Sequence, residues 1–322
     1  MKKFIAMAVL GAAAIAAVYT TACKSSKKEP KATAQNDSLN KVIERGNYLA
    51  QHVTMCIDCH SKRDFSKYSG PVMVGSEGMG GYDFAQEVEG FPGHLYAKNI
   101  TPDAETGIGS WSDEEILRAI TQGINKKGDT LFPLMPYIHY NQMAKDDLLA
   151  IIAYIRTLKP INHKVPDRQL MMPLSMVYPA PVLKPSVDEN KRPPETDAVN
   201  YGQYLVNASV CSDCHTPMNE KGEYDFSKMF AGGFVFKLPS NKVNTSNITP
   251  DATGLGTWSE ERFMNKFTIC REKGGCDYDP GSQNTTMPVI AYSGMTDTDL
   301  KAIYAFLRTV KPISNMVEKY PK

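Results

Sequence analysis

The sequence predicts an all-α protein made of two tandem copies of one domain, joined by a Pro-rich linker. Three observations lead to this prediction: short motifs that occur twice in the same order, helical spacing of apolar residues in both copies, and little strand signal. The 322 residues suffice for two domains of ordinary size. We expect the first domain at 39–161, the linker at 162–196 and the second domain at 197–322.

The composition excludes several classes of protein. With 42% hydrophobic and 22% charged residues, the chain has the composition of a globular protein and not of a disordered one. Lys and Arg number 36 and Asp and Glu 35, so the net charge gives no reason to expect a nucleic-acid partner.

The N-terminus has the pattern of an export signal. Two lysines precede an uncharged, mostly aliphatic stretch at 4–19, which is too short for a confident membrane span. The small residue before Cys23 resembles the lipobox of bacterial lipoproteins. We therefore expect a lipoprotein-type signal peptide at 1–23, lipidation of Cys23 and a solvated tether at 24–38; cleavage without lipidation and an uncleaved anchor are the alternatives. In each case the folded part lies outside the cytoplasm.

An internal repeat divides the remaining chain. The repeated motifs are a Gly-x-Tyr-Leu segment, a CxxCH motif, an Asn-Ile-Thr-Pro-Asp segment, a Trp, a Met-Pro pair and a closing Arg-Thr-x-Lys-Pro-Ile segment. Their positions are 46–49 and 202–205, 56–60 and 211–215, 99–103 and 247–251, Trp111 and Trp258, 135–136 and 287–288, and 156–161 and 308–313. Six motifs in the same order indicate duplication of a whole domain.

Each copy shows signals for several helices. We expect a first helix at 40–53, and Ser112 with Glu115 forms a capping box that opens a second helix, for which Ser259 is the counterpart cap. The last helices, expected at 146–158 and 298–310, carry an apolar stripe and end at a Lys-Pro pair.

A glycine in each first helix, Gly46 or Gly202, should allow the first and last helices of a copy to approach closely.

The segment 162–196 contains seven prolines, which predicts an extended linker. Its middle part, 170–183, is apolar, so we expect it to lie along one or both domains. A docking surface for a partner is the alternative.

The two CxxCH motifs carry the chemistry. Their thiols and imidazoles are those of Cys56, Cys59 and His60 in the first copy and of Cys211, Cys214 and His215 in the second. This spacing brings two thiols to the vinyl groups of one porphyrin and places an imidazole beside the iron. Zinc sites and thioredoxin-like redox pairs share the CxxC part, but the wide separation of the pairs and the helical flanks disfavour both. We therefore expect two covalently bound c-type haems.

The second axial ligand is predicted to be Met135 for the iron of the first copy and Met287 for that of the second. Each Met occupies the matching place in the repeat and is followed by a proline that helps to hold the loop. Another Met, a His, or an iron with an open position are the alternatives. The remaining histidines have no counterpart in the other copy and are expected to lie at the surface or to make local hydrogen bonds; they are His52, His94, His139 and His163.

The other two cysteines, Cys270 and Cys276, have five residues between them and lie where the second copy has five more residues between its Trp and its Met than the first. In an oxidising compartment they are expected to form a disulfide, with a redox-active pair as the alternative. The two tryptophans, Trp111 and Trp258, are candidates to donate an indole N–H to a haem propionate, although core packing explains them as well.

Taken together, these motifs resemble the class I cytochrome c domains of the multihaem cytochrome subunits of bacterial alcohol and gluconate dehydrogenases. The resemblance covers most of both copies, and it implies that His60 and Met135 hold one iron and that His215 and Met287 hold the other. The chain departs from the family in having no third CxxCH motif and an N-terminal lipid signal instead of a C-terminal membrane helix.

The expected function is electron transfer and not catalysis. Two filled axial positions leave no place for peroxide or oxygen on the iron. We expect an exported, lipid-anchored dihaem cytochrome on the periplasmic side of a bacterial membrane, which relays single electrons from a dehydrogenase to a respiratory oxidase or cytochrome. A dihaem peroxidase, with one Met displaced, and a redox sensor are the alternatives.

Overall fold

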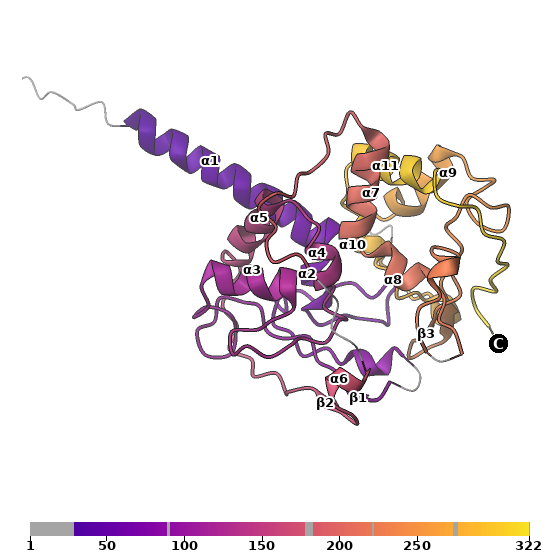
Figure 1. Cartoon of the computed structure of the whole chain (residues 1–322), viewed down its shortest axis with the longest axis horizontal. Coiled ribbons are helices and arrows are strands. Elements are labelled where there is room, and N and C mark those ends of the chain that lie inside the picture. Colours follow the sequence, from indigo (N-terminus) through magenta and orange to yellow (C-terminus); the bar gives the residue numbers. More distant parts are fainter. Residues whose placement is uncertain (1–28, 89–90, 178–182, 221, 273–275, 322) are drawn as a thin grey trace, which may run out of the picture. The chain divides into compact units, whose positions relative to one another are not determined.

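Helices form most of the regular structure in the computed structural model of the chain (Figure 1). The structure describes residues 29–88, 91–177, 183–220, 222–272 and 276–321. The predicted signal peptide, with Cys23, lies outside these residues.

The helices of the two halves follow the same order. In the first half they are α1 (Glu29–Tyr48), the π-helical turn η1 (Leu49–Val53), α2 (Cys56–Cys59), the 3₁₀ turn η2 (Phe84–Gln86), α3 (Asp113–Gln122), α4 (Tyr137–Tyr140) and α5 (Lys145–Ile155). The linker contains α6 (Leu174–Val177). In the second half they are α7 (Ala198–Ala208), α8 (Cys211–His215), η3 (Phe226–Lys228), α9 (Glu260–Thr268), η4 (Gly281–Gln283), α10 (Val289–Ser293) and α11 (Asp297–Leu307).

Short strands correct the prediction of an all-α fold. They are β1 (Gly93–His94) paired with β2 (Gln169–Leu170), and β3 (Val235–Lys237) paired with β4 (Lys242–Asn244), and both pairs are antiparallel. Strands of two or three residues are too short to show the alternation of period two that reveals a strand in a sequence.

The first helix is longer than expected. It begins at Glu29, inside the segment predicted as a tether, and continues through η1 to Val53. Residues 29–38 are therefore helical, which suits their Lys, Ala and Gln content and the proline in the first turn. Side chains at 36–42 are exposed, and burial begins at Gly46.

The two predicted caps are confirmed. The Ser112 side chain accepts a hydrogen bond from the backbone N–H of Glu115, and the Glu115 carboxylate accepts one from the backbone N–H of Ser112. Ser259 caps α9 in the same way through the N–H of Arg262.

The predicted close approach of first and last helices is confirmed in both halves. A Cβ atom on Gly46 would lie 1.8 Å from the carbonyl oxygen of Ala150 in α5, and one on Gly202 would lie 1.9 Å from that of Ala302 in α11. Only glycine permits these crossings.

Residues 39–322 form one compact unit that includes both halves and the linker. One cluster of buried apolar side chains continues from the first half into the second; it includes Leu49, Leu148, Ile151, Leu205, Leu300 and Ile303.

The linker is attached to the first half at several points. Its strand β2 pairs with β1, and Val187 is buried in the core. The Asn141 side chain donates a hydrogen bond to the carbonyl of Lys184 and accepts one from its backbone N–H. The expectation that its apolar part is covered holds only in part, because Met171 is 81% exposed.

Candidate functional site

A strained residue precedes each CxxCH motif. The short helices α2 and α8 begin at Cys56 and Cys211, and the preceding residues, Met55 and Val210, have left-handed φ values of 53° and 48°. This conformation is unfavourable for side chains with a Cβ, and most of all for a β-branched one such as Val. Strain that occurs at the same place in both halves is typical of a functional site.

The four cysteines of the two motifs form no disulfide. One helical turn separates the two cysteines of each motif, so both thiols lie on the same side of the helix. All four are free thiols and partly buried; they are Cys56, Cys59, Cys211 and Cys214.

Both imidazoles are oriented by a backbone carbonyl. The Nδ1 of His60 lies 2.6 Å from the carbonyl oxygen of Lys98, and the Nδ1 of His215 lies 2.7 Å from that of Ser246. A carbonyl only accepts, so Nδ1 carries the proton and Nε2 keeps its lone pair. Metal-binding histidines are oriented by this kind of bond.

The protonation of these groups agrees with ligation. Burial lowers the pKa of His60 and His215, which favours the neutral imidazole. Burial raises the pKa of the Cys56 thiol to about 11 and that of Cys59 to about 12. Redox-active CxxC pairs need a thiol pKa that is lowered, so this environment does not suit a thioredoxin-like reaction.

The Asn-Ile-Thr segment fixes the backbone beside each imidazole. The Oδ1 of Asn99 accepts hydrogen bonds from the backbone N–H and the hydroxyl of Thr101, and its Nδ2 donates to the carbonyl of Ile161 at 2.8 Å. Lys98, whose carbonyl binds His60, is the residue before this Asn.

The second half repeats this network. The Oδ1 of Asn247 accepts from the N–H and the hydroxyl of Thr249, and its Nδ2 donates to the carbonyl of Ile313. The sequence showed this motif only as a repeat; its role as a support for the imidazole was missed, although the motif follows each CxxCH motif in order.

The two candidate methionines lie just before short helices. Met135 precedes Pro136, the residue before α4, and Met287 precedes Pro288, the residue before α10. Both methionines are partly buried and pack against the main core. The same core is contacted by Cys56, Cys211, Trp111 and Trp258, so these candidate residues gather around one apolar cluster.

A buried tyrosine connects each methionine segment to its CxxCH motif. The hydroxyl of Tyr140, in α4, donates to the carbonyl of Thr54 at 2.7 Å, and that of Tyr292, in α10, donates to the carbonyl of Ser209 at 2.9 Å. Each carbonyl belongs to a residue two positions before the first cysteine. Sequence reasoning missed both tyrosines; the signal was their equal spacing from Met-Pro.

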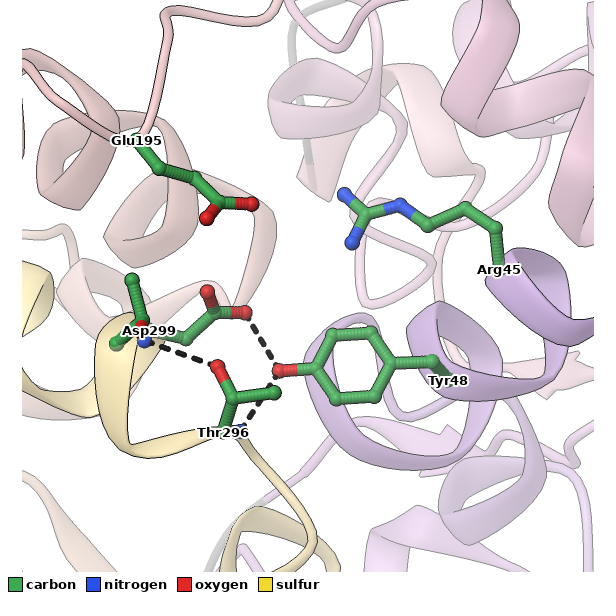
Figure 2. A pocket seen from close by; sticks show the side chains of 6 residues that line it. Arg45, Tyr48, Glu195, Thr296 and Asp299 are labelled. Carbon is green, nitrogen blue, oxygen red and sulfur yellow. Dashed lines mark hydrogen bonds between the residues drawn. The ribbon is translucent and has the colours of Figure 1, made fainter.

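The two halves contact each other through reciprocal Tyr–Asp pairs. Tyr48 donates to Asp299 at 2.5 Å and accepts from the N–H of Thr296, as Figure 2 shows. Tyr204 donates to Asp147 at 2.7 Å and accepts from the N–H of Ala144. The three groups of one contact are the repeat counterparts of the three groups of the other. Tyr48 corresponds to Tyr204, Asp299 to Asp147, and the N–H of Thr296 to that of Ala144. The interface is therefore close to two-fold symmetric, as between the subunits of a homodimer.

A cavity of about 300 Å³ opens at this interface (Figure 2). Its lining residues are Arg45, Tyr48, Glu195, Thr296, Thr298 and Asp299.

One histidine of the first half hydrogen-bonds a residue inside the second CxxCH motif. His139, in α4, makes hydrogen bonds with Asn207 at 2.8 Å and with Asp213, inside the second motif, at 2.7 Å. Burial lowers the pKa of His139, but the hydrogen bond and charge of Asp213 outweigh it and the pKa is raised. His52 bonds the carbonyl of Ala291 in the second half, so these two histidines bridge the halves instead of making the local hydrogen bonds expected of them.

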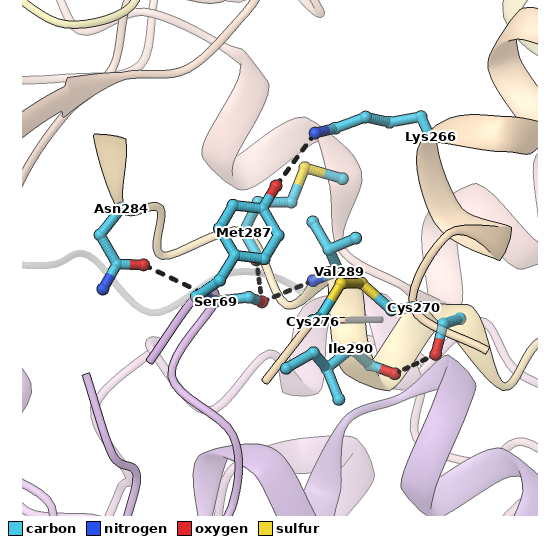
Figure 3. Close-up of a disulfide and its surroundings, with 10 residues drawn as sticks. Ser69, Lys266, Cys270, Cys276, Asn284, Met287, Val289 and Ile290 are labelled. Atoms are coloured by element: carbon cyan, nitrogen blue, oxygen red, sulfur yellow. Dashed lines mark hydrogen bonds between the residues drawn. A yellow bond between two sulfur atoms is a disulfide. The ribbon is translucent and has the colours of Figure 1, made fainter. Parts of the chain in front are cut away.

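Cys270 and Cys276 form a disulfide with a Cα–Cα distance of 5.1 Å. Cys276 is buried beside Tyr68 of the first half and Val289 of the second (Figure 3). The disulfide itself thus lies at the interface between the halves.

The tryptophans are held through their carbonyls. Arg156 donates to the carbonyl of Trp111, Tyr304 donates to that of Trp258, and the Arg262 guanidinium lies 4.3 Å from the Trp258 ring.

Part of the chain is similar in sequence to a known family. The family model for cytochrome c matches residues 199–311. This chain contains a cytochrome c domain. Such a domain implies a covalently bound c-type haem, a group whose iron exchanges single electrons.

Its relatives agree. It is 30% identical over 297 residues to the cytochrome c subunit of alcohol dehydrogenase (quinone) of Gluconobacter oxydans, over 86% of this chain and 56% of that protein. It is 31% identical to the gluconate 2-dehydrogenase cytochrome c subunit of Pantoea cypripedii, over 87% of this chain and 62% of that protein. It is 28% identical to a diheme cytochrome c-type protein of Cereibacter sphaeroides, over 80% of this chain and 82% of that protein. The resemblance predicted from the motifs is confirmed.

The chain spans about 60% of the length of the two dehydrogenase subunits. In the part of the chain that the structure describes, no helix is long and apolar enough to cross a membrane.

Proposed function

We propose that this chain is an exported, membrane-tethered dihaem cytochrome that passes single electrons from a dehydrogenase to a respiratory acceptor. Its two halves, 39–161 and 197–322, are tandem class I cytochrome c domains joined by the linker at 162–196. The relatives that are named as cytochrome c subunits of dehydrogenases support the donor, and the relative named as a diheme cytochrome supports the number of haems.

The duplicated imidazole environment carries this proposal. In both halves the histidine of CxxCH is buried or partly buried, neutral, and bonded through Nδ1 to a backbone carbonyl, which leaves Nε2 for iron. Only one half is matched by the family model, but the other has the same imidazole, cysteine and Asn-Thr geometry.

The residues of each half fit a haem as follows. The cysteines would supply the thioether attachments, His60 and His215 would each supply a nitrogen ligand to iron, and Met135 and Met287 would each supply a sulfur ligand. A bound haem contributes one-electron chemistry of its iron, with a potential raised by a Met ligand. The apolar cluster around the site keeps water away, and the strained residue before each motif holds the cysteines in place.

Export and anchoring follow from the N-terminal pattern. Lipidation of Cys23 would keep the protein at the periplasmic face of a membrane, within reach of a membrane dehydrogenase. The tryptophans Trp111 and Trp258 are proposed as donors to haem propionates, a role compatible with their partial burial.

The test is the optical spectrum of the purified full chain together with its haem stoichiometry. We expect two haems per chain and a near-infrared charge-transfer band from Met bound to ferric iron. Met135→Ala and Met287→Ala should each remove about half of this band, because each removes one of two equal ligand sets. Met143→Leu, at a fully buried core position, is the matched control and should leave the band unchanged.

Other outcomes point to other functions. One haem per chain, or a band that survives both Met substitutions, would contradict the proposed ligands. Tight binding of carbon monoxide to the reduced native protein would reveal an open iron position and favour the peroxidase alternative.

A further inference from the structure

A loop of the first half lies directly on the methionine segment of the second half. This loop, residues 64–70, follows the first CxxCH motif and contacts residues 284–289 (Figure 3). The contact joins residues that are 218 positions apart in the sequence.

Ser69 makes the central contact. Its hydroxyl donates to the carbonyl of Met287 at 2.7 Å and accepts from the N–H of Val289 at 2.9 Å. Ser69 is 1% exposed, so water does not replace either bond. The hydroxyl thereby fixes the backbone on both sides of Pro288.

Asn284 secures the loop from the other side. Its side chain is fully buried, its Oδ1 accepts from the N–H of Ser69 at 3.0 Å, and its Nδ2 donates to the carbonyls of Phe65 and Lys67. The corresponding residue of the first half is Phe132, which has no polar side chain.

Arg63 continues the contact to the first CxxCH motif. Its guanidinium lies 3.0 Å from the carboxylate of Asp58, between the two cysteines, and donates to the carbonyl of Ser69 at 2.6 Å. A continuous polar path therefore joins the first motif to Met287 through Arg63 and Ser69.

In the described part of the chain, the segment that holds Met135 has no matching contact from the second half. There, side chains of the second half bond His139, Ala144 and Asp147, and none of these bonds reaches the backbone of residues 132–136, which form that segment. The support is one-sided, although the helices around it are nearly two-fold symmetric.

We propose that Ser69 is a positioning residue for Met287, so that ligation of the second haem depends on the first domain. This inference rests on the proposed function, because it takes Met287 as an axial ligand. Without the Ser69 hydroxyl, a buried carbonyl and a buried N–H lose their partner, and the segment that presents the sulfur loses its fixed position. A weaker sulfur ligand lowers the reduction potential of that iron.

The experiment replaces Ser69 in the full chain by Gly and, separately, by Ala. Both remove the hydroxyl, but only Gly suits the left-handed φ of 63° at this position. A loss caused by the hydroxyl appears in both variants, whereas a loss caused by backbone strain does not appear in Ser69→Gly. Ser66→Ala is the matched control, because Ser66 is exposed in the same loop and its hydroxyl bonds only Asp64.

Two readouts are compared, the near-infrared Met–iron band and the two midpoint potentials from a spectroelectrochemical titration. We expect Ser69→Gly to reduce the band by up to half and to lower one potential while the other stays. In the Met135→Ala background the remaining band belongs to the second site, and Ser69→Gly should reduce it there as well.

The result separates this inference from the proposed function. If Met287→Ala fails to remove half of the band, the proposed ligand set is wrong. If Met287→Ala removes it but Ser69→Gly leaves the band and both potentials unchanged, or shifts both potentials equally, the positioning role of Ser69 is overturned.

Discussion

At the scale of single residues, the histidine of each CxxCH motif depends on a carbonyl that is itself held by a neighbouring asparagine. Asn99 and Asn247 are buried and make the same set of bonds in the two halves. The amide side chain satisfies a backbone N–H, a hydroxyl and a distant carbonyl at once, which few other side chains can do.

We therefore expect Asn99→Ala to lower the free energy of unfolding by about 2 kcal/mol, because several buried hydrogen bonds are lost and their partners stay buried. It should also change the spectrum of the haem that we propose on His60 and leave that of the haem proposed on His215 unchanged. Urea denaturation and the visible spectrum measure these effects. Asn162→Ala, an exposed position with one bond to Glu105, is the control, and an equal cost for both variants would refute the argument.

At the scale of helices, two glycine crossings hold the first and last helix of each half together. The space beside Gly46 and Gly202 is filled by backbone, which cannot rotate away as a side chain can. The crossing therefore tolerates no side chain at either position.

Gly46→Ala should destabilise the protein by about 2 kcal/mol. The added methyl group would lie 1.8 Å from the carbonyl oxygen of Ala150, and such overpacking costs about 1–3 kcal/mol or more, which exceeds the gain of about 1 kcal/mol in helix propensity. Urea unfolding measures the change. Asn47→Ala, exposed on the same helix, should be neutral or slightly stabilising; a stable Gly46→Ala variant would show that the helices can separate without cost.

At the scale of the whole molecule, Asp147 gathers groups from three parts of the chain. It is 1% exposed, accepts from Tyr204 of the second half, and pairs with Arg45 of α1 and with Arg192 of the linker. Burial alone would raise the pKa of Asp147, but the bonds and charges of these partners outweigh it, and its pKa lies below the ordinary value.

The pH dependence follows from this direction. An Asp whose pKa is lowered on folding stabilises the fold fully above the unfolded pKa of about 3.9, and the stabilisation is lost as the pH falls through the folded pKa. Asp147→Asn should therefore cost about 2–3 kcal/mol at neutral pH and much less below the folded pKa.

Chemical denaturation across the acid range measures this difference. Asp146→Asn, an exposed neighbour, is the control and should change stability little. A cost for Asp147→Asn that stays constant with pH would show that the carboxylate charge does not hold the parts together.

The sequence by itself determined those features that depend on local spacing or on repetition. The CxxCH motifs, the Ser112 and Ser259 caps and the glycine crossings could be predicted because each follows from residues close together, or from a pattern present in two copies. The same local information missed the strands of two or three residues, which are too short to show a period.

Only the tertiary structure decided how one half supports the other. Ser69, Tyr48 and His139 are ordinary polar residues in the sequence, and their partners lie far away along the chain. Which carbonyl or carboxylate each one meets is decided when the two halves of the chain pack against each other, and no local propensity encodes that contact.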